Sequence, residues 1–462
     1  MTVSIEDLGR RLEAIGQGHL IAAARRLPDR ERWTLFAELS ELDLDLVERL
    51  ARAARQPEVH AAAALEPAPV VAPHREPHLS GEMQDARALG ERLRREGKVA
   101  YVLVAGGQAT RLGIDAPKGT FPIGPVSSRT LFEIHADRLR ALAKRGGRTP
   151  LWFVLTSPMN HDATLTFFAE RRWLGLPRDR IVFVPQATVP AFDREGKLVL
   201  ETRARLFRNP NGHGGVLLAL AESGFLARCR EEGVEHLFYW QVDNPLVRLG
   251  EPLFLGLHAR AGAGMSSKVV EKRDPAEKVG VLARANGKTV CVEYSDLAPD
   301  LRAARDASGR LAYAAGNIAI HLLDVGFVEG LTRGGLRLPW HRAEKKIRAH
   351  RDGATEEVAG VKFETFVFDA LAASDRTVTL EVKRESEFAP VKNAEGEDSP
   401  ATARDAMRRS FSKWFREAGV DVGEAADVEV HPLFAFDSAE FASKLAAVPT
   451  PIRTPLYLAP PP

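Results

Sequence analysis

A buried strand that opens into a glycine-rich, basic loop constrains this chain more than any other feature. The apolar run from Lys98 to Ala105 leads directly into the segment 106–113, which holds three glycines and Arg111, and Pro117-Lys118-Gly119 follows. Glycines expose backbone N–H groups and cations neutralise negative charge, so such a loop is suited to hold phosphate groups. Its spacing fits neither GxxxxGK[ST] nor GxGxxG, so it indicates a nucleotide-binding protein other than a P-loop NTPase or a dinucleotide dehydrogenase.

Each residue of this loop also has a plainer interpretation. Gly106 and Gly107 could form a tight turn after the strand, and Arg111 and Lys118 could be solvated surface charges. For single glycines and single charges the plainer interpretation is usually right. Here both cations and four glycines fall in one short segment directly after a buried strand, which favours the phosphate-binding role.

Composition limits what the loop can belong to. With 462 residues, 45% of them hydrophobic, the chain can form one large domain and one or two smaller ones. Its net charge of +2 creates no field that would attract nucleic acid or an anionic membrane, so neither is an expected partner. Cys229 and Cys291 lack CxxC spacing, which argues against a disulfide framework or a thiolate metal site. A polar, acidic start and the lack of a long apolar run predict a cytoplasmic protein.

Apolar strands alternate with amphipathic helices after the loop, which indicates a mostly parallel, mixed sheet covered by helices on both faces. The predicted strands span residues 98–105, 151–156, 181–184 and 236–242, and the predicted helices span 131–144, about 160–172 and 215–232. The predicted fold class is therefore α/β. In such sheets ligands bind outside the carboxyl ends of the strands. The glycine loop after Ala105 and Asp243 after Val242 both fall at that edge.

Other segments flank this alternating pattern. Residues 4–52 carry apolar residues at helical spacing, and residues 53–82 have the Ala-Pro composition of an extended connector. Residues 265–323 predict an antiparallel addition with a hairpin at Asn286-Gly287, and the tail predicts a helix at 401–418 with short strands after it. We therefore predict a helical N-terminal unit and linker over 1–85, a main domain over 86–384 and a small α+β C-terminal domain over 385–462.

The loop is one of a longer set of motifs. Ala105-Gly-Gly-Gln-Ala-Thr-Arg-Leu-Gly113 with Pro117-Lys-Gly119 resembles the signature of the eukaryotic-type UDP-sugar pyrophosphorylases, and more closely their UDP-N-acetylglucosamine branch than their UDP-glucose branch. Further matching motifs follow in order along most of the chain: Gln186, Asn211–Gly215, Val242–Asn244, Lys268–Lys272, Val279–Val281, Val292–Ser295, Ala315–Ile318, His341–Lys346, Phe363–Asp369 and Phe388–Asn393. The resemblance implies a Rossmann-like nucleotide-diphospho-sugar transferase fold in the main domain.

The reaction that this resemblance implies explains the need for such residues. A sugar 1-phosphate attacks the α-phosphate of UTP, pyrophosphate leaves and a UDP-sugar forms, with Mg²⁺ screening the phosphates. The attacking phosphate oxygen is already ionised, so alignment and charge stabilisation suffice without a protein nucleophile. N-acetylglucosamine 1-phosphate is the first candidate substrate, and N-acetylgalactosamine 1-phosphate or glucose 1-phosphate comes next. A glycosyltransferase and a non-catalytic UDP-sugar sensor are the alternatives.

The resemblance assigns the nucleotide to residues from two parts of the chain. Ala105, Gly106 and Gly107 with the following loop would bind the uridine and phosphates, and Gln186 and Gly214 would lie near the uracil. An amide side chain offers both the donor and the acceptor that the imide edge of uracil needs. Without the resemblance, the glutamine could be a hydrogen-bonded residue at a strand end, and the glycines around 214 could be an ordinary turn and helix start.

Three cations and one carboxylate are the candidates for binding the reacting phosphates and their metal ion. Arg111 and Lys118 would neutralise the triphosphate and the departing pyrophosphate, and Lys392 resembles a lysine that the family brings from outside the main sheet. Asp243, directly after an apolar strand, is the metal candidate, because one carboxylate can hold Mg²⁺ while phosphates and waters complete its coordination. The plainer interpretations are an exposed loop lysine at 392 and an aspartate that caps the turn at Asn244.

Gly280, Glu293 and Asn317 are the candidates for the sugar, since hydroxyl and acetamido groups call for a carboxylate acceptor and an amide. Glu293 could instead be a solvent-facing residue of a hairpin. One residue departs from the family pattern, because Ala109 stands where the family usually has glycine. A positive φ angle there would cost roughly 1 kcal/mol and shift the loop, whereas an ordinary φ would make the substitution harmless.

Overall fold

The computed structural model describes residues 5–56, 64–351, 353–423 and 426–460. By its contacts the chain forms two compact units, and each unit combines segments that are far apart in the sequence. The first unit comprises residues 1–62, 186–215 and 338–367, and the second comprises 63–185, 216–337 and 368–462. The linear division at residues 85 and 384 stays a prediction of domain limits.

The first unit begins with the predicted helical segment. Its helices are α1 (Ile5–Ala14), α2 (Gly18–Arg25), α3 (Asp29–Ser40) and α4 (Leu44–Ala54). Gly16 lies in the break before α2, and Pro28 lies directly before α3. Asp43 caps α4 by accepting hydrogen bonds from the N–H groups of Asp45 and Leu46. The apolar faces of these helices are buried, as their spacing predicted.

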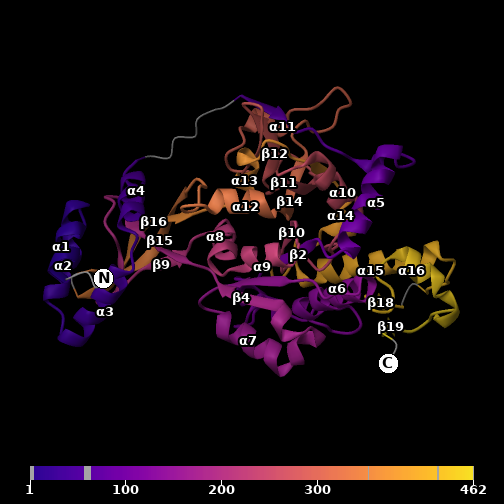
Figure 1. Cartoon of the computed structure of the whole chain (residues 1–462), viewed down its shortest axis with the longest axis horizontal. Helices are drawn as coiled ribbons and strands as arrows, with labels where there is room; N and C mark the ends of the chain where they lie inside the picture. The colour runs from indigo at the N-terminus through magenta and orange to yellow at the C-terminus, as the bar shows by residue number, and fades with distance from the viewer. Residues whose placement is uncertain (1–4, 57–63, 352, 424–425, 461–462) are drawn as a thin grey trace. The chain divides into compact units, whose positions relative to one another are not determined.

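Strands from the middle of the chain complete the core of this unit. Phe192, Val361 and Phe363 join the buried leucines of the helices in one apolar cluster. Figure 1 shows the strands of this unit beside the N-terminal helices. The buried Gln17 side chain donates to the Gly196 carbonyl and accepts from the Leu198 N–H, both at 2.8 Å. The strands pair as β15–β16–β6, β5–β9 and β7–β8: β5 (Thr188–Pro190), β6 (Phe192–Asp193), β7 (Leu200–Thr202), β8 (Arg205–Leu206), β9 (Arg208–Pro210), β15 (His341–Arg351) and β16 (Ala354–Glu364).

The second unit is built on a ten-stranded mixed sheet whose path runs β1-β12-β14-β10-β2-β3-β4. Four predicted strands form its parallel part: β2 (Val99–Val104), β3 (Trp152–Thr156), β4 (Ile181–Pro185) and β10 (His236–Gln241). Successive residues of β3 contact helices on opposite faces, since the Trp152 ring packs on Phe168 and the Phe153 ring packs on Phe225. The predicted α/β class, with helices covering both faces, is confirmed.

The helices between residues 81 and 387 include the two that were predicted to begin near residues 131 and 160, together with others that were not predicted from the sequence. They are α5 (Gly81–Arg95), α6 (Leu131–Gly146), α7 (His161–Glu170), α8 (Gly215–Glu222), α9 (Phe225–Glu231), α10 (Pro252–Ala261), α11 (Pro299–Ala303), α12 (Val325–Thr332), α13 (Ala370–Ala373) and α14 (Arg384–Glu387). A capping box of Thr130 and Glu133 starts α6. The single helix predicted over 215–232 is wrong, because Gly224 at a φ of 76° separates α8 from α9.

The antiparallel addition is confirmed on the other side of β10. Its antiparallel strands are β1 (Leu65–Pro67), β11 (Met265–Glu271), β12 (Val281–Ala285), β13 (Lys288–Val292) and β14 (Ala315–Asp324). Strand β17 (Thr379–Glu381) pairs with β11 in parallel. Asn286 and Gly287 form the predicted turn, with φ angles of 50° and 76°. Strand β1 lies within the predicted connector 53–82, so that segment is not wholly an extended linker, and residues 57–63 lie outside the described part.

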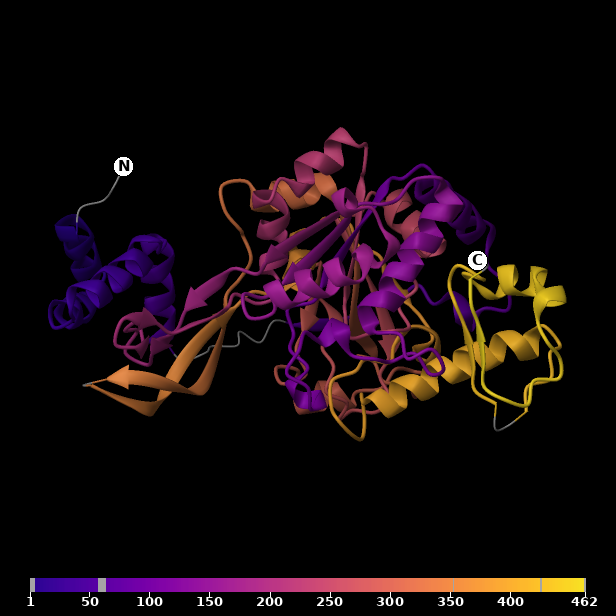
Figure 2. The same ribbon diagram turned by 90° about the horizontal axis from the view of Figure 1, so that it is seen from below.

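The C-terminal segment of the second unit is small and mixed, as predicted. It contains α15 (Pro400–Glu417), β18 (Val428–Val430), α16 (Ser438–Ser443) and β19 (Leu456–Leu458), and Figure 2 shows the long α15 leading into it. Its own apolar cluster includes Phe415 and Phe441. The buried Glu429 carboxylate accepts from the N–H groups of Val126 and Ser127 at 2.8 Å and attaches this segment near α6. Among the described residues, no helix has the length and apolarity needed to cross a bilayer.

Candidate active site

The glycine loop closes on itself so that Lys118 lies beside Gly107. The Lys118 N–H donates to the Gly107 carbonyl at 3.0 Å, and the Ala109 N–H donates to the Ala116 carbonyl at 2.9 Å. Gly107 is exposed and Gly106 half-buried, which leaves their backbone accessible, and Arg111 is exposed on a short 3-10 turn. Gly119 is needed for packing, since a Cβ there would lie 2.2 Å from the Phe132 ring. The loop therefore combines the accessible backbone of Gly106 and Gly107 with the cation of Lys118, whose own backbone is hydrogen-bonded to the loop.

Lys118 also reaches the predicted metal residue. Its Nζ lies 3.6 Å from Oδ2 of Asp243, and both side chains are largely buried. Asp243 stands just beyond the carboxyl end of β10, and its neighbour β2 leads into the glycine loop, so parallel pairing brings the two together. His135 from α6 donates a hydrogen bond to the Val242 carbonyl at 3.0 Å and fixes the chain next to Asp243. The prediction that both groups share one edge of the sheet agrees with this geometry.

Lys392 lies on a segment that is bound directly to Asp243. The Val391 N–H donates to the Asp243 carbonyl at 2.9 Å, so the neighbouring lysine belongs to the same region. The Lys392 ammonium is 46% exposed, 3.6 Å from Oδ2 of Asp398 and 5.7 Å from the centre of the Phe388 ring. The segment of Lys392 therefore lies at the candidate site, while the Lys392 ammonium itself lies near Asp398 and Phe388.

The three sugar candidates form a second cluster at the junction of β12, β13 and β14. The Asn317 N–H donates to the Gly280 carbonyl at 2.8 Å, and a Cβ on Gly280 would lie 3.2 Å from Oε1 of Glu293. Glu293 follows β13 directly and is half-buried, so it differs from a solvent-facing hairpin residue. A register shift in the β11–β14 pair and a φ of 54° at Ala319 mark a bulge next to Asn317. Bulges of this kind redirect side chains.

The amide of Asn317 has a defined orientation. Its Oδ1 accepts a hydrogen bond from the Ala319 N–H at 3.0 Å, and its Nδ2 lies 3.6 Å from Sγ of Cys291. Burial raises the pKa of the Cys291 thiol far above its ordinary value, so this sulfur stays protonated and is only a weak acceptor. The amide nitrogen of Asn317 therefore keeps the capacity to donate to a carbonyl or hydroxyl group.

The two uracil candidates lie together in the first unit. The buried Gln186 side chain donates from Nε2 to the Gly212 carbonyl at 2.6 Å, which ties it to the glycine turn of Gly214. The local structure already requires glycine at two positions here. Gly212 has a φ of 82°, and a Cβ on Gly214 would lie 2.8 Å from the backbone of Phe366. The plainer interpretation thus explains these glycines, and the uracil assignment stays a prediction.

Asn160 is a site residue that the sequence reasoning missed. It follows β3, is fully buried, and donates from Nδ2 to the carbonyls of Ala105 and Gly107 at 3.0 and 3.3 Å. Its Oδ1 accepts from the Ser157 N–H at 2.7 Å. Asn160 thereby fastens the start of the glycine loop to the next loop of the sheet. A polar residue soon after a predicted apolar strand, at the ligand edge, was the available signal.

Asp243 is the group best placed to hold a metal ion. Within the described residues no three His, Cys, Asp or Glu side chains gather as a metal-binding group. A single carboxylate beside the glycine loop fits Mg²⁺, which takes one or two protein carboxylates and fills its coordination from substrate phosphates and water. It does not fit a structural Zn²⁺ site, which needs four protein ligands.

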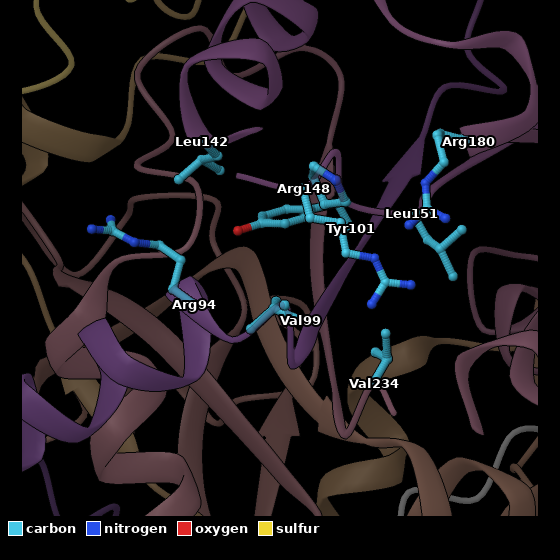
Figure 3. A pocket seen from close by; sticks show the side chains of 10 residues that line it. Arg94, Val99, Tyr101, Leu142, Arg148, Leu151, Arg180 and Val234 are labelled. Carbon is cyan, nitrogen blue, oxygen red and sulfur yellow. The ribbon is translucent and has the colours of Figure 1, made fainter. Parts of the chain in front are cut away.

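Two cavities lie away from these residues. Val99, Leu151 and Val234, at the amino ends of parallel strands, line a cavity of about 20 Å³ beside Tyr101 and three arginines (Figure 3). That volume is enough for about one water molecule and not for a nucleotide. A cavity of about 1090 Å³ lies along α15 and the C-terminal strands, and none of the predicted site residues lines it. The carboxyl edge of the sheet stays the predicted substrate site.

Comparison with known proteins agrees with the motifs. The family described as UTP–glucose-1-phosphate uridylyltransferase matches residues 48–407. The chain belongs to this family. It is 34% identical to UDP-N-acetylglucosamine diphosphorylase 2 of Arabidopsis thaliana, over 93% of this chain and 90% of that protein. It is 36% identical to human UDP-N-acetylhexosamine pyrophosphorylase-like protein 1, over 90% and 86% of the two chains.

A solved structure covers the whole architecture. The uridine diphosphate N-acetylglucosamine pyrophosphorylase of Trypanosoma brucei superposes with a TM-score of 0.80 at 25% identity, over 99% of both chains. The resemblance to UDP-sugar pyrophosphorylases stated from the motifs is confirmed, and the chain is an enzyme of the nucleotidyltransferase class.

Proposed function

We propose that this enzyme transfers the uridylyl group of UTP to N-acetylglucosamine 1-phosphate, forming UDP-N-acetylglucosamine and pyrophosphate. The observation that carries the proposal is the Lys118–Asp243 pair, in which the lysine ammonium lies 3.6 Å from a carboxylate oxygen beside the glycine loop. The names of the curated relatives, which match about nine-tenths of the chain, support the same reaction and the N-acetylated sugar.

The chemistry needs positioned charge more than proton transfer. An oxygen of the sugar phosphate forms a bond to the α-phosphorus of UTP while the bond from that phosphorus to the pyrophosphate oxygen breaks. Lys118 and the accessible N–H groups of the glycine loop stabilise the charge that develops on the phosphates. Arg111 and Lys392 add to this field from the loop and from the segment bound to Asp243.

Magnesium is part of the proposal, with Asp243 as its protein ligand. When bound, the ion would neutralise phosphate charge and favour departure of pyrophosphate. Lys118 lies next to this carboxylate and is hydrogen-bonded through its backbone to the glycine loop, where its ammonium can contact the triphosphate. A cytoplasmic location stays a prediction.

The orientation of Asn317 supports an N-acetylated sugar. Its Oδ1 accepts from the Ala319 N–H, and its Nδ2 donor is directed at the weak acceptor Sγ of Cys291, which lies next to Gly280. A carbonyl such as that of an acetamido group suits this donor, and the Glu293 carboxylate suits sugar hydroxyls. The sugar assignment therefore rests on a hydrogen-bond pattern as well as on the relatives.

Pyrophosphate release tests the proposal. Purified protein with UTP and Mg²⁺ is assayed with N-acetylglucosamine, N-acetylgalactosamine and glucose 1-phosphates, and the first is expected to give the highest kcat/KM. Asp243→Asn is expected to lower kcat about 100-fold or more, because the charge that holds the metal is lost. Asp375→Asn is the matched control, since Asp375 forms an ion pair with Lys288 at the exposed surface.

The result separates the alternatives. Efficient release with glucose 1-phosphate alone would make the enzyme a UTP–glucose-1-phosphate uridylyltransferase. Tight binding of UDP-sugar without release from any substrate, unaffected by Asp243→Asn, would indicate a sensor and would contradict the proposal.

A further inference from the structure

A buried ionic cluster lies behind the proposed phosphate site. Lys268 of β11 is completely buried, and its Nζ lies 2.6 Å from Oε2 of Glu387 and 3.2 Å from Oε2 of Glu251. The same ammonium lies 5.5 Å from the centre of the Phe254 ring. Burying a lysine is unfavourable unless it is paired, and here two carboxylates supply the pairing.

The two carboxylates come from different elements. Glu251 precedes α10, whereas Glu387 is the last residue of α14 and begins the segment that leads to Lys392. Both carboxylates neutralise the same ammonium, but only Glu387 belongs to the segment that carries a proposed catalytic cation.

That segment is fastened to the metal residue and its neighbour by three hydrogen bonds. Asn244 donates from Nδ2 to the Glu387 carbonyl at 2.7 Å and accepts at Oδ1 from the Ala389 N–H at 3.2 Å. The Val391 N–H donates to the Asp243 carbonyl at 2.9 Å. Residues 387–391, which we call the strap, therefore begin at the ion pair of Glu387, pass Asp243 and lead to Lys392.

A buried ion pair contributes little net stability compared with well-packed apolar residues, whereas it fixes the geometry of the groups that it joins. From this arrangement we propose that Lys268 and Glu387 are positioning residues, which hold the strap 387–391 so that Lys392 meets the phosphates beside Asp243. The proposal rests on the uridylyl transfer proposed above. Neither residue contacts substrate, and both act through Lys392.

The two carboxylates provide a matched test. Glu387→Met and Glu251→Met each remove one acceptor of similar size and leave Lys268 paired with the other carboxylate. Glu387→Met is expected to lower kcat about tenfold, with the KM for the sugar 1-phosphate changed less than about twofold. Glu251→Met is expected to leave kcat within about twofold. Should the methionine variants not fold, Glu387→Gln and Glu251→Gln give the same comparison.

Two further measurements separate positioning from general damage. In a Lys392→Met background, Glu387→Met is expected to have less than about a twofold additional effect on kcat, because residues that act through one another are not additive. Hydrogen exchange in the free protein is expected to show lost protection of Ala389 and Val391 in Glu387→Met and not in Glu251→Met.

Equal effects of the two substitutions on kcat or on protection would overturn the proposal. So would an undiminished effect of Glu387→Met in the Lys392→Met background. A wild-type protein that releases no pyrophosphate would refute the proposed function instead, and the exchange measurement would still decide whether Glu387 holds the strap.

Discussion

Ala109 has ordinary backbone angles, a φ of −92° and a ψ of 21°, and it is fully buried in the glycine loop. The concern that an alanine at this position strains the loop is therefore removed, since a methyl group carries no penalty at negative φ. We predict that Ala109→Gly lowers the free energy of unfolding by about 0.5–1 kcal/mol, through added chain entropy in the unfolded state. The KM for UTP is expected to stay within about twofold, measured with pyrophosphate release.

Gly119→Ala is the contrasting substitution in the same loop. The added Cβ would lie 2.2 Å from the Phe132 ring, so the loop or the ring must move and a clear loss of stability is expected. Thermal unfolding of the two variants compares the effects directly. Tighter UTP binding in Ala109→Gly would show that the methyl group obstructs the loop, contrary to this prediction.

That the glycine loop and Asp243 share one edge of the sheet was predictable, because the carboxyl ends of neighbouring parallel strands meet there. The contact of Lys118 with Asp243 was not predicted, since it depends on how the loop closes. The φ angle of Ala109 was not predictable, since alanine is compatible with several conformations and only the closed loop selects one. The role of Asn160 could have been found by the same edge argument, whereas its two carbonyl partners depend on how the loop closes.

At the scale of elements, Asn160 joins the loop after β2 to the loop after β3. We predict that Asn160→Ala lowers the free energy of unfolding by about 1–3 kcal/mol, because the Ser157 N–H loses its side-chain acceptor in a buried place. The loosened glycine loop is also expected to raise the KM for UTP severalfold. Chemical denaturation and pyrophosphate release measure the two effects.

Ser157→Ala is the control for Asn160→Ala. It removes a buried hydroxyl for which the described structure provides no partner, and it keeps the backbone bond to Asn160. Its stability and KM are expected to match the wild type. An unchanged KM for UTP in Asn160→Ala would mean that the loop keeps its shape without this clamp.

Periodic apolar segments such as β2 and β10 were predicted to within about two residues, since burial on both faces leaves a continuous apolar run. Strand β1 was not predicted, because three residues ending in Pro67 carry no periodic signal and depend on pairing with β12. The long strands β15 and β16 were also missed, since their charged, exposed residues do not show the alternation of a half-buried strand.

At the scale of the whole molecule, the two units could not be predicted from the sequence, because each combines segments that are far apart along the chain. The first unit takes in residues 186–215 and 338–367 because Phe192 and Val361 bury apolar surface against the N-terminal helices. Such contacts join segments more than a hundred residues apart. Sequence periodicity predicts local structure, and it does not predict which distant segments pack against each other.

Buried histidines give both units a shared response to acid. Burial lowers the pKa of His135 and His258 to about 3 and that of His213 to about 4, from an ordinary value near 6.5. Between these values the unfolded chain binds more protons than the folded chain, so stability is full above pH 6.5 and falls as the pH drops. Each such histidine contributes a slope of roughly 1.4 kcal/mol per pH unit.

Between pH 6.5 and 5 the histidines dominate the pH dependence of the unfolding free energy. Carboxylates with lowered pKa values, such as Glu440 at about 2, lose their stabilising effect only below the pKa of glutamate in the unfolded chain. We predict that His258→Asn reduces the slope of unfolding free energy against pH by roughly 0.7 kcal/mol per unit at pH 6.5, rising to roughly 1.3 at pH 5, measured by urea denaturation at several pH values. His78→Asn, at an exposed position, is expected to leave the slope unchanged. An equal slope in wild type and His258→Asn would mean that His258 is charged in the folded protein, with its Ser266 hydrogen bond rearranged.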